Sequence, residues 1–495
     1  MSISKVFGLR VLFGKCSLVI GKNVKIKQAR EYSSLSSVNV KDKNKSTAYQ
    51  PIADFYSGKS VFVTGGTGFL GKVFVEKLLY SCSKLDKVYL LVREKKGKNV
   101  NKRIEDLFAN PLFSRLKKSN PDYMKKVVPV TGDMRLPNLG LSKRDEQTLI
   151  DEVSVVYHAA ATLRFDEPLP VAMNINFEGT QQILELSRRM KNMEAFIYIS
   201  TAFSQSQRNV LVERVYPPPA KVRDVYKFIE ENGHDTEETM KFISDCNKPN
   251  TYTFTKALAE SYIASNHGEI PMVIIRPSIV ASTKDEPVKG WVDNWSTPIT
   301  THILFNSAKG WNRFCLGTGS HMVDFIPVDY VSNLSIIAGA RAKRSKDAQI
   351  FNSTASSENP ISCSDVMKYF NQEIISRNKN DMPYPSVIFL KSKTLINIGT
   401  FLLQTAPAHI VDLWLRITGK EPRYAKLVSH IVMKRNAYDP FTTKSWVMRA
   451  ERAMELFSSL SDEDKQTFPC DPTQIEWSEY FRDYCKGVLK YLKEY

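Results

Sequence analysis

Residues 61–72 read VFVTGGTGFLGK, in which glycines at positions 65, 66, 68 and 71 follow directly on an apolar run. Glycine inside a regular element is unfavourable, so this density indicates a backbone path that side chains would block. The apolar run predicts a short strand, and the segment FLGKVFVEKLLYSC that follows has helical periodicity. A glycine-rich turn between a strand and a helix is typical of a dinucleotide-binding site.

Gly65, Gly68 and Gly71 have the spacing G-x-x-G-x-x-G within this turn. The first glycine allows the tight turn, the middle one lets the backbone approach a pyrophosphate, and the third lets the helix pack on the sheet. The N-terminus of the helix offers unpaired N–H groups and a partial positive charge to the phosphates. We therefore predict a nucleotide site formed by Thr64, Gly65, Gly66, Thr67, Gly68, Phe69, Leu70 and Gly71.

The alternation of strand and helix continues along the chain. Apolar runs predict further strands in KVYLLVRE (87–94), KVVPVTGD (126–133), VSVVYHAAA (153–161), AFIYISTAFS (195–204) and MVIIRPSIV (272–280). Strands that are apolar throughout indicate an α/β fold, a doubly wound parallel Rossmann-type sheet with helices on both faces. The alternation fades after about residue 353, and the pattern becomes helical from residue 364. We predict a basic leader and linker over 1–50, a nucleotide-binding domain over 51–360 and a helical C-terminal domain over 361–495.

The most apolar stretch of this C-terminal part is residues 395–417. It contains Pro407, Asp412 and Arg416, which make it a poor transmembrane helix. A buried helical hairpin and a hairpin lying on a bilayer surface both fit the pattern.

The whole chain of 495 residues is basic, with a formal net charge of +17 and a pI of about 9.3. This balance favours an anionic partner such as nucleic acid, an acidic membrane surface or a polyphosphate ligand, although a solvated basic surface gives the same numbers. The seven cysteines are scattered and form no Cys-x-x-Cys or Cys/His cluster. Their pattern argues for a reducing compartment and against structural zinc or a disulfide framework.

The N-terminal leader is basic and poor in acids. Its first acidic residue, Glu31, comes after seven lysines and arginines, and serine-rich sequence follows. Residues 1–32 therefore resemble a mitochondrial presequence. A disordered basic tail and a membrane-surface anchor are the alternatives.

The end of the second strand, LLVREKKGK, bears on the choice of nucleotide. Sites that prefer NAD place an acid here to bind the ribose 2′-hydroxyl. Arg93 occupies this position instead, and a guanidinium pairs well with the 2′-phosphate of NADPH. Glu94 follows directly and keeps NADH open. Asp133, in TGD after the third strand, is expected beside the adenine, or else in a turn or helix cap.

A second motif, TYTFTKALAE, places Tyr252 and Lys256 four residues apart, on one face of a helix. A lysine charge near the phenol would favour tyrosinate and lower the tyrosine pKa from about 10. The fifth strand ends in Ser200 and Thr201, at the sheet edge where α/β proteins bind ligands. We predict Thr201, or as second choice Ser200, as a substrate hydroxyl partner beside Tyr252. His158, at the fourth strand's end, fits a structural role better than that of a base.

Together these motifs resemble the extended short-chain dehydrogenase/reductases. VYHAAATLRFDEPL, PNTYTFTKALAE, DFIPVDYV and the C-terminal SLSDEDKQTFPCDPTQIEWSEYFRDYC narrow the resemblance to the fatty acyl-CoA reductases of the animal and insect type, from about residue 52 to the end. The resemblance implies NADPH-dependent reduction of a long-chain acyl-CoA to a primary alcohol through a bound aldehyde. Tyr252, Lys256 and Thr201 would form the catalytic group, with no metal and no nucleic acid partner.

Other implications of the resemblance concern location and neighbouring segments. It points to a membrane-associated enzyme of the endoplasmic reticulum or peroxisome, while the leader keeps mitochondria open. The insertion 205–249 fits a lid, and Asp324 and Asp329 fit structural roles. Two other functions remain open: another extended-family oxidoreductase acting on a sterol or nucleotide sugar, and a catalytically silent NADP-binding membrane or scaffold protein.

Overall fold

A computed structural model describes residues 49–95, 97–232, 235–293, 299–377, 379, 381–382 and 386–492. Residues 51–495 form one compact unit. The predictions made for the leader 1–32 lie outside the described residues.

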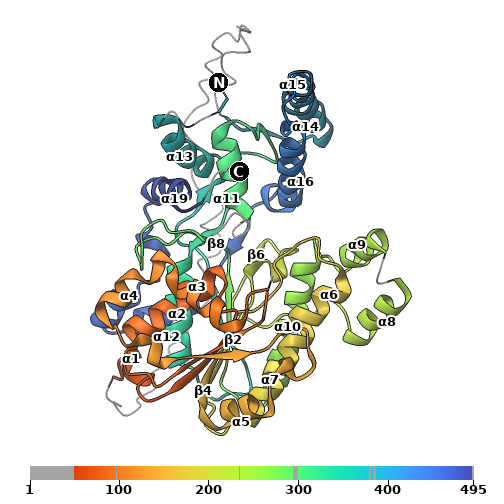
Figure 1. Cartoon of the computed structure of the whole chain (residues 1–495). Helices are drawn as coiled ribbons and strands as arrows, with labels where there is room; N and C mark the ends of the chain where they lie inside the picture. The colour runs from red at the N-terminus through yellow and green to blue at the C-terminus, as the bar shows by residue number, and fades with distance from the viewer. Residues whose placement is uncertain are drawn as a thin grey trace, which may run out of the picture. The chain divides into compact units, whose positions relative to one another are not determined.

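The centre of the fold is a sheet of seven parallel strands in the order β12-β7-β5-β4-β1-β2-β3 (Figure 1). Six of these strands lie in the predicted runs, and β12 is an addition at the sheet edge. Their bounds are β1 Ser60–Thr64, β2 Val88–Val92, β3 Val127–Thr131, β4 Val153–His158, β5 Ala195–Ile199, β7 Met272–Pro277 and β12 Gln349–Ser353. The predicted α/β, doubly wound class is confirmed.

Two hydrophobic cores cover the two faces of the sheet. Val61 and Val63 pack into the first with α2 (Phe69–Ser81) and α12 (Val328–Ala340). Phe62 points the other way, into the second core with α7 (Gly179–Arg189) and α10 (Thr251–Asn266). This alternation follows from the two-residue period of a strand, and it explains why every residue of β1 is buried. Other helices of this region are α1 Ile52–Phe55, α3 Val100–Ala109, α4 Ser114–Ser119, α5 Lys143–Glu152 and α6 Leu169–Met173.

The C-terminal helices gather above the sheet in Figure 1. They are α13 Cys363–Ser376, α14 Lys393–Thr400, α15 Ala406–Ile417, α16 Tyr424–Thr442 and α19 Trp477–Tyr491. Two further C-terminal helices lie against the sheet instead: α17 Glu451–Ser458 contacts α12 and β12, and α18 Asp462–Thr467 lies beside α1, where Asp464 accepts the Ile52 N–H. Helix α11 (Ile299–Lys309) comes from the middle of the chain but packs against α13, α16 and α19. The helical layer therefore draws on residues before position 361, and the domain boundary there stays a prediction.

The insertion 205–249 is itself folded. It contains β6 (Val210–Leu211), α8 (Val222–Asn232) and α9 (Thr236–Asp245). Phe228 of α8 stacks on Phe242 of α9 with ring centroids 4.3 Å apart, and Val225 and Ile243 are fully buried in the second core. The role of this segment as a lid stays a prediction.

The apolar stretch 395–417 is largely exposed, so the prediction of a buried hairpin is wrong. Helices α14 and α15 are joined by a π-helical turn, Phe401–Thr405, and only one side of this continuous helical segment is buried. The buried residues recur every four positions: Ile396, Thr400, Gln404, Ala408 and Asp412. The other side is apolar and open to solvent. Its exposed members are Leu395, Ile398, Phe401, Leu402, Leu403, Ile410, Leu413, Trp414 and Ile417, and we call this set the apolar face.

None of the described helices is both long enough and apolar enough to cross a bilayer.

Candidate active site

The glycine turn has the geometry that a bound dinucleotide requires. Gly65 has φ of +76°, and a Cβ there would lie 2.7 Å from the backbone N of Ala160. A Cβ on Gly71 would lie 2.2 Å from the Gly65 carbonyl oxygen, so α2 can pack on the turn only because residue 71 has no side chain. Gly68 caps α2, which begins at Phe69. The first N–H groups of α2 are therefore presented beside a bare backbone, as phosphate binding requires.

Two guanidinium groups lie at the end of β2. Arg93 is 41% exposed, and its Nη1 atom lies 3.8 Å from the Asp133 carboxylate. Arg103, from α3, donates to the Arg93 carbonyl and, at 3.0 Å, to the Thr67 hydroxyl of the glycine turn. Burial and the neighbouring Arg93 charge lower the pKa of Arg103. The two arginines place positive charge next to the turn. Arg103 was not predicted from the sequence, and the helix after β2 is where such a residue could have been sought.

Asp133 has protein partners of its own. Its carboxylate accepts hydrogen bonds from the Arg135 guanidinium at 2.7–3.1 Å and from the Arg135 backbone N–H at 3.0 Å. These bonds, against the opposing effect of burial, lower the pKa of Asp133. The turn role is present in the structure, and the adenine role stays a prediction.

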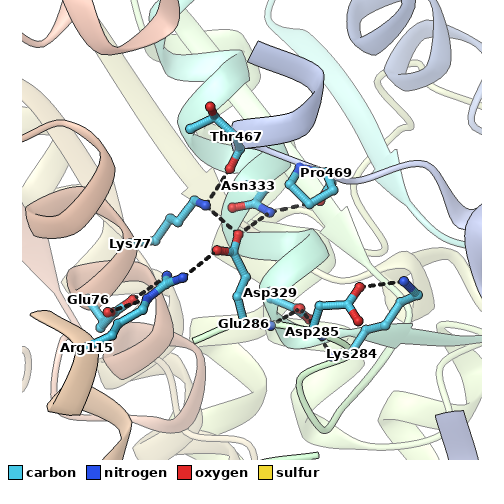
Figure 2. Close-up of polar contacts among 10 residues, drawn as sticks. All are labelled: Glu76, Lys77, Arg115, Lys284, Asp285, Glu286, Asp329, Asn333, Thr467 and Pro469. Carbon is cyan, nitrogen blue, oxygen red and sulfur yellow. Dashed lines mark hydrogen bonds and ion pairs between the residues drawn. The ribbon is translucent and has the colours of Figure 1, made fainter. Parts of the chain in front are cut away.

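A buried ionic network ties α2 to segments far away in the sequence (Figure 2). Lys77 of α2 binds the Glu286 carboxylate and the Thr467 carbonyl oxygen. Glu286 also accepts from Arg115 at 2.8 Å, and Arg115 in turn pairs with Glu76 of α2 at 2.9 Å. The loop 284–293 is thereby fastened against the helix that begins at the nucleotide turn. At the other end of this loop, Trp291 stacks on Phe69 and Asp293 pairs with Lys72.

The two aspartates of DFIPVDY organise backbone. Asp329 accepts the N–H groups of Lys284, Asp285 and Glu286 at 2.9–3.2 Å, which shapes the start of that same loop. Asp324 accepts those of Ala355 and Ser356 at 2.9 and 2.8 Å. The structural interpretation of both residues is confirmed.

Tyr252, Lys256 and Thr201 meet at the carboxyl end of β5. Asn250 caps α10 through a bond to the Thr253 N–H, so Tyr252 lies in the first turn of the helix. The Thr201 side chain acts on the Tyr252 phenol and lowers its pKa, and the Thr201 hydroxyl itself donates to the Pro277 carbonyl at 3.5 Å. The Lys256 ammonium, 2% exposed as a residue, donates to the Ile199 carbonyl at 2.7 Å and lies 4.6 Å from the centre of the Tyr198 ring. The structure therefore brings the three predicted side chains to one sheet edge.

Ser200 points to a different set of partners. Its hydroxyl donates to the Glu260 carboxylate at 2.6 Å. Glu260 forms a fully buried ion pair with Arg276 of β7. Tyr252, Lys256 and Glu260 have successive spacings of four along α10, so extending the motif by one more turn could have found this pair. The geometry favours Thr201 over Ser200 as the partner of the phenol.

The predicted direction of the Tyr252 pKa is wrong. Burial raises the pKa of Tyr252 to about 12, although the bond from Thr201 opposes this shift. Burial also lowers the pKa of Lys256 to about 7, against the opposing effect of Glu260. Removal from water sets the direction of the Tyr252 shift, and the Lys256 charge, which the sequence spacing had suggested would dominate, is not among its causes. The phenol is therefore protonated at neutral pH, as a proton donor must be.

His158 is held as a structural residue. Its Nδ1 atom lies 2.7 Å from the Thr64 hydroxyl and its Nε2 atom 2.9 Å from the Thr180 hydroxyl. Complete burial, with the Lys256 charge, lowers the pKa of His158 to about 3. The ring is neutral and bonds Thr64, the last residue of β1, beside the glycine turn.

Comparisons with known proteins give the family. Two family models match, both described as male sterility protein, over residues 63–335 and 403–494. Fatty acyl-CoA reductase 1 of Rattus norvegicus is 36% identical over 446 residues, which cover 89% of this chain and 86% of that protein. The chain belongs to the fatty acyl-CoA reductase family. Fatty acyl-CoA reductase 2 of Mus musculus, 36% identical over 451 residues, covers the same shares.

As a member of the fatty acyl-CoA reductase family the protein is an oxidoreductase with a nicotinamide cofactor, and the glycine turn and α2 N-terminus fit such a group. Solved structures agree on the fold. The terminal R domain of the myxalamid biosynthetic pathway has a TM-score of 0.56 at 18% identity, covering 88% of this chain and 91% of that one. The reductase domain of a nonribosomal peptide synthetase from Mycobacterium tuberculosis has a TM-score of 0.56 at 16% identity, covering 87% and 91%.

Proposed function

We propose that this protein reduces long-chain fatty acyl-CoA to a primary alcohol and free CoA, using NADPH, through an aldehyde that stays bound. The observation that carries the proposal is the convergence of Tyr252, Lys256 and Thr201 at the carboxyl end of β5, in the same sheet whose β1 leads into the glycine turn. The names of the curated relatives support the substrate class.

In the proposed mechanism Tyr252 is the proton donor. The nicotinamide, when bound, supplies a hydride to the carbonyl carbon in each of two rounds. Tyr252 and Thr201 hold the carbonyl oxygen, and the phenol gives it a proton as negative charge develops. The tetrahedral product of the first round loses CoA as the thiol and leaves an aldehyde. The second round converts that aldehyde into the alcohol by the same proton donation.

Lys256 positions the Tyr252 phenol and returns a proton to it after each donation. Its ammonium is held by the Ile199 carbonyl on the same helix face as the phenol. Because the pKa of Lys256 is about 7, its ammonium can give a proton back to the Tyr252 side chain near neutral pH. Its charge also stabilises a transient tyrosinate.

We propose NADPH over NADH because two guanidinium groups stand at the end of β2. Arg93 is the exposed group that would meet a 2′-phosphate. Arg103 backs it by holding its carbonyl and the glycine turn. A guanidinium matches the oxygens of a phosphate better than those of a ribose diol.

The test is product analysis by mass spectrometry. The purified protein is incubated with NADPH and a panel of acyl-CoAs, and in parallel with sterol ketones and nucleotide sugars. The expected result is primary alcohol from long-chain acyl-CoA only. Turnover of a sterol or nucleotide sugar would favour the other oxidoreductase function. NADPH binding without any turnover would favour a silent binding protein.

We further propose that the apolar face docks on an anionic membrane surface, without spanning it. The face carries Phe401, Leu402, Leu403 and Trp414, each more than half exposed. Lysines and arginines flank it on the surface, at Lys391, Lys393, Arg416, Lys420, Arg423 and Lys426. Asp412 lies on the buried side, where it caps α16 through the N–H groups of Arg423, Tyr424 and Ala425. An apolar face with a basic border is typical of an interfacial helix.

Vesicle flotation tests this docking. The wild-type protein is expected to float with phosphatidylserine-containing vesicles and to be released by high salt. Leu413→Asp is expected to lose binding. Met240→Asp on α9, which also places an aspartate at an exposed apolar position, is the matched control. Equal flotation of both variants would refute docking through the apolar face, and resistance to carbonate washing would favour a true span. In cells we expect the protein on the endoplasmic reticulum or peroxisome.

A further inference from the structure

Glu260 places a buried carboxylate one helical turn beyond Lys256 on α10. Its Oε2 atom accepts from Nε of Arg276 at 3.1 Å, and its Oε1 atom accepts from Nη2 of the same guanidinium at 2.5 Å. Oε2 also accepts the Ser200 hydroxyl at 2.6 Å. The side chains of Glu260 and Arg276 are 2% and 0% exposed, so water and salt screen their charges very little.

The Arg276 guanidinium is fixed from its other side by backbone. It donates to the Val212 carbonyl at 3.1 Å and to the Arg214 carbonyl at 2.7 Å. Glu213, between these two residues, directs its own carboxylate to the N–H group of Asn352 at 2.9 Å and to N–H groups in the first turn of α17. Glu260 is therefore the carboxylate that pairs with this guanidinium.

Lys256 is the catalytic side chain nearest to Glu260 along α10. Residues four apart on a helix lie on the same face, with Cβ atoms about 5–6 Å apart. The partners of the buried Lys256 ammonium are the Ile199 carbonyl at 2.7 Å and the Tyr198 ring at 4.6 Å, and neither carries a negative charge. Burial lowers the pKa of Lys256 to about 7, and the Glu260 charge opposes that shift.

The other titratable groups that face Lys256 are neutral. Tyr252 on α10 and Tyr198 on β5 are phenols whose pKa values burial raises, that of Tyr252 to about 12. His158 on β4 is neutral because burial, with the Lys256 charge, lowers its pKa to about 3. Among the described residues, Glu260 is thus the one carboxylate that acts on the charge of Lys256.

A second lysine, Lys248 in the loop before α10, also faces this carboxylate. Burial lowers the pKa of Lys248 to about 8, again against the opposing charge of Glu260. The carboxylate therefore lies among Arg276, Lys248 and Lys256, three buried cations. A guanidinium does not lose its proton in proteins, whereas a buried lysine does so readily. Without Glu260, the repulsion among these cations would be relieved by loss of a proton from a lysine.

We propose that Glu260 is a positioning residue whose fixed carboxylate keeps the buried Lys256 side chain in its charged form. The inference rests on the proposed function, because it concerns the lysine that returns a proton to Tyr252. A neutral Lys256 could neither reprotonate the phenol nor stabilise a transient tyrosinate.

The experiment is the pH dependence of kcat/KM in Glu260→Gln, which keeps the shape of the side chain and removes its charge. A nearby opposite charge changes a pKa by about 1–3, and kcat/KM reports the free enzyme. We expect the decline of kcat/KM with rising pH to begin about one pH unit lower than in the wild type. The loss relative to wild type should be roughly tenfold at a pH of about 8 and less than about twofold at a pH of about 5.5.

Three further variants separate the charge from the fold. Glu260→Asp retains the charge, so its decline should stay near the wild-type pH. Glu76→Gln is the matched control, because it removes a buried carboxylate from an arginine pair on the opposite face of the sheet and should leave the pH of the decline unchanged.

Glu260→Gln combined with Arg276→Gln removes both buried charges together, so it should fold even where the single variant does not. Its decline should still begin at a lower pH, since the Glu260 charge acting on Lys256 is gone. An unchanged pH of the decline in the charge-removing variants would overturn the proposal, and so would an equal shift in Glu260→Asp or Glu76→Gln.

A titration without substrate separates this proposal from the proposed function. The NMR signals of isotope-labelled lysine ε-carbons are followed against pH in the full chain, and the Lys256 signal is identified by its absence in Lys256→Met. A midpoint about one pH unit lower in Glu260→Gln than in wild type supports the proposal even if no acyl-CoA is reduced. Equal midpoints overturn it. Absence of alcohol formation by the wild-type protein refutes the proposed function alone.

Discussion

Replacing Arg93 by alanine should separate the two nicotinamide cofactors. The guanidinium is 41% exposed and lies 3.8 Å from Asp133, so part of its charge is already shared and screened. A hydrogen bond to a charged group contributes about 1.5–3 kcal/mol, and the exposed setting argues for the lower end. We therefore expect Arg93→Ala to weaken NADPH binding roughly tenfold, since about 1.4 kcal/mol is a factor of ten. NADH, which lacks the 2′-phosphate, should change less than about twofold.

The assay is titration of the purified protein with each cofactor, followed by nicotinamide fluorescence. Arg103→Ala serves as a contrasting variant, because Arg103 also supports the glycine turn through Thr67 and should weaken both cofactors. Lys102→Ala is the matched control, since it removes the same charge from an exposed neighbour on α3 that pairs with Glu105. Equal losses of NADPH and NADH in Arg93→Ala would refute the reasoning and make Arg93 a structural residue.

Three other outcomes follow from the site. Tyr252→Phe should lower alcohol formation about 10²–10⁴-fold with NADPH affinity retained, and near-normal turnover would exclude the phenol as the acid. Burial lowers the Lys256 pKa to about 7, so the charged form of Lys256 is lost as the pH rises through this value. We therefore expect kcat/KM to fall above a pH of about 7, and a kcat/KM that stays constant up to a pH of about 9 would contradict the role of the charged lysine. Glu286→Gln leaves Lys77 without its buried carboxylate partner and should destabilise the fold by about 3 kcal/mol in urea unfolding, whereas Lys125→Gln at the surface should not.

Much of the nucleotide-binding half could be predicted because its signals are local. Four closely spaced glycines are enough to predict the glycine turn, and a continuous apolar run predicts a strand that is buried on both faces. β12 escaped prediction because its sequence QIFNS mixes polar and apolar residues, and its place at the sheet edge comes from pairing with β7. The exposure of residues 395–417 could not be predicted either, because an apolar run has the same composition whether it is buried in the protein or exposed to solvent.

The candidate site divides in the same way. The spacing of Tyr252 and Lys256 predicted that they share a helix face, and the strand end predicted that Thr201 and Ser200 lie near them. The choice between the two hydroxyls depends on Glu260, which pairs with Arg276 and accepts the hydrogen bond from Ser200. This bond leaves Thr201 as the partner of the phenol. Arg103 reaches the site from a helix that carries no motif, so its role depends on packing.

By itself the sequence determined the doubly wound α/β fold, the glycine turn and the tyrosine–lysine pair, because each arises from residues close together in the chain. Only the tertiary structure decided the raised pKa of Tyr252, the anchoring of α2 through Glu286 and Thr467, and the buried pair of Glu260 with Arg276. Burial and buried ion pairs are produced by elements that are separated along the chain. Their effects on charge appear only when those elements are brought together.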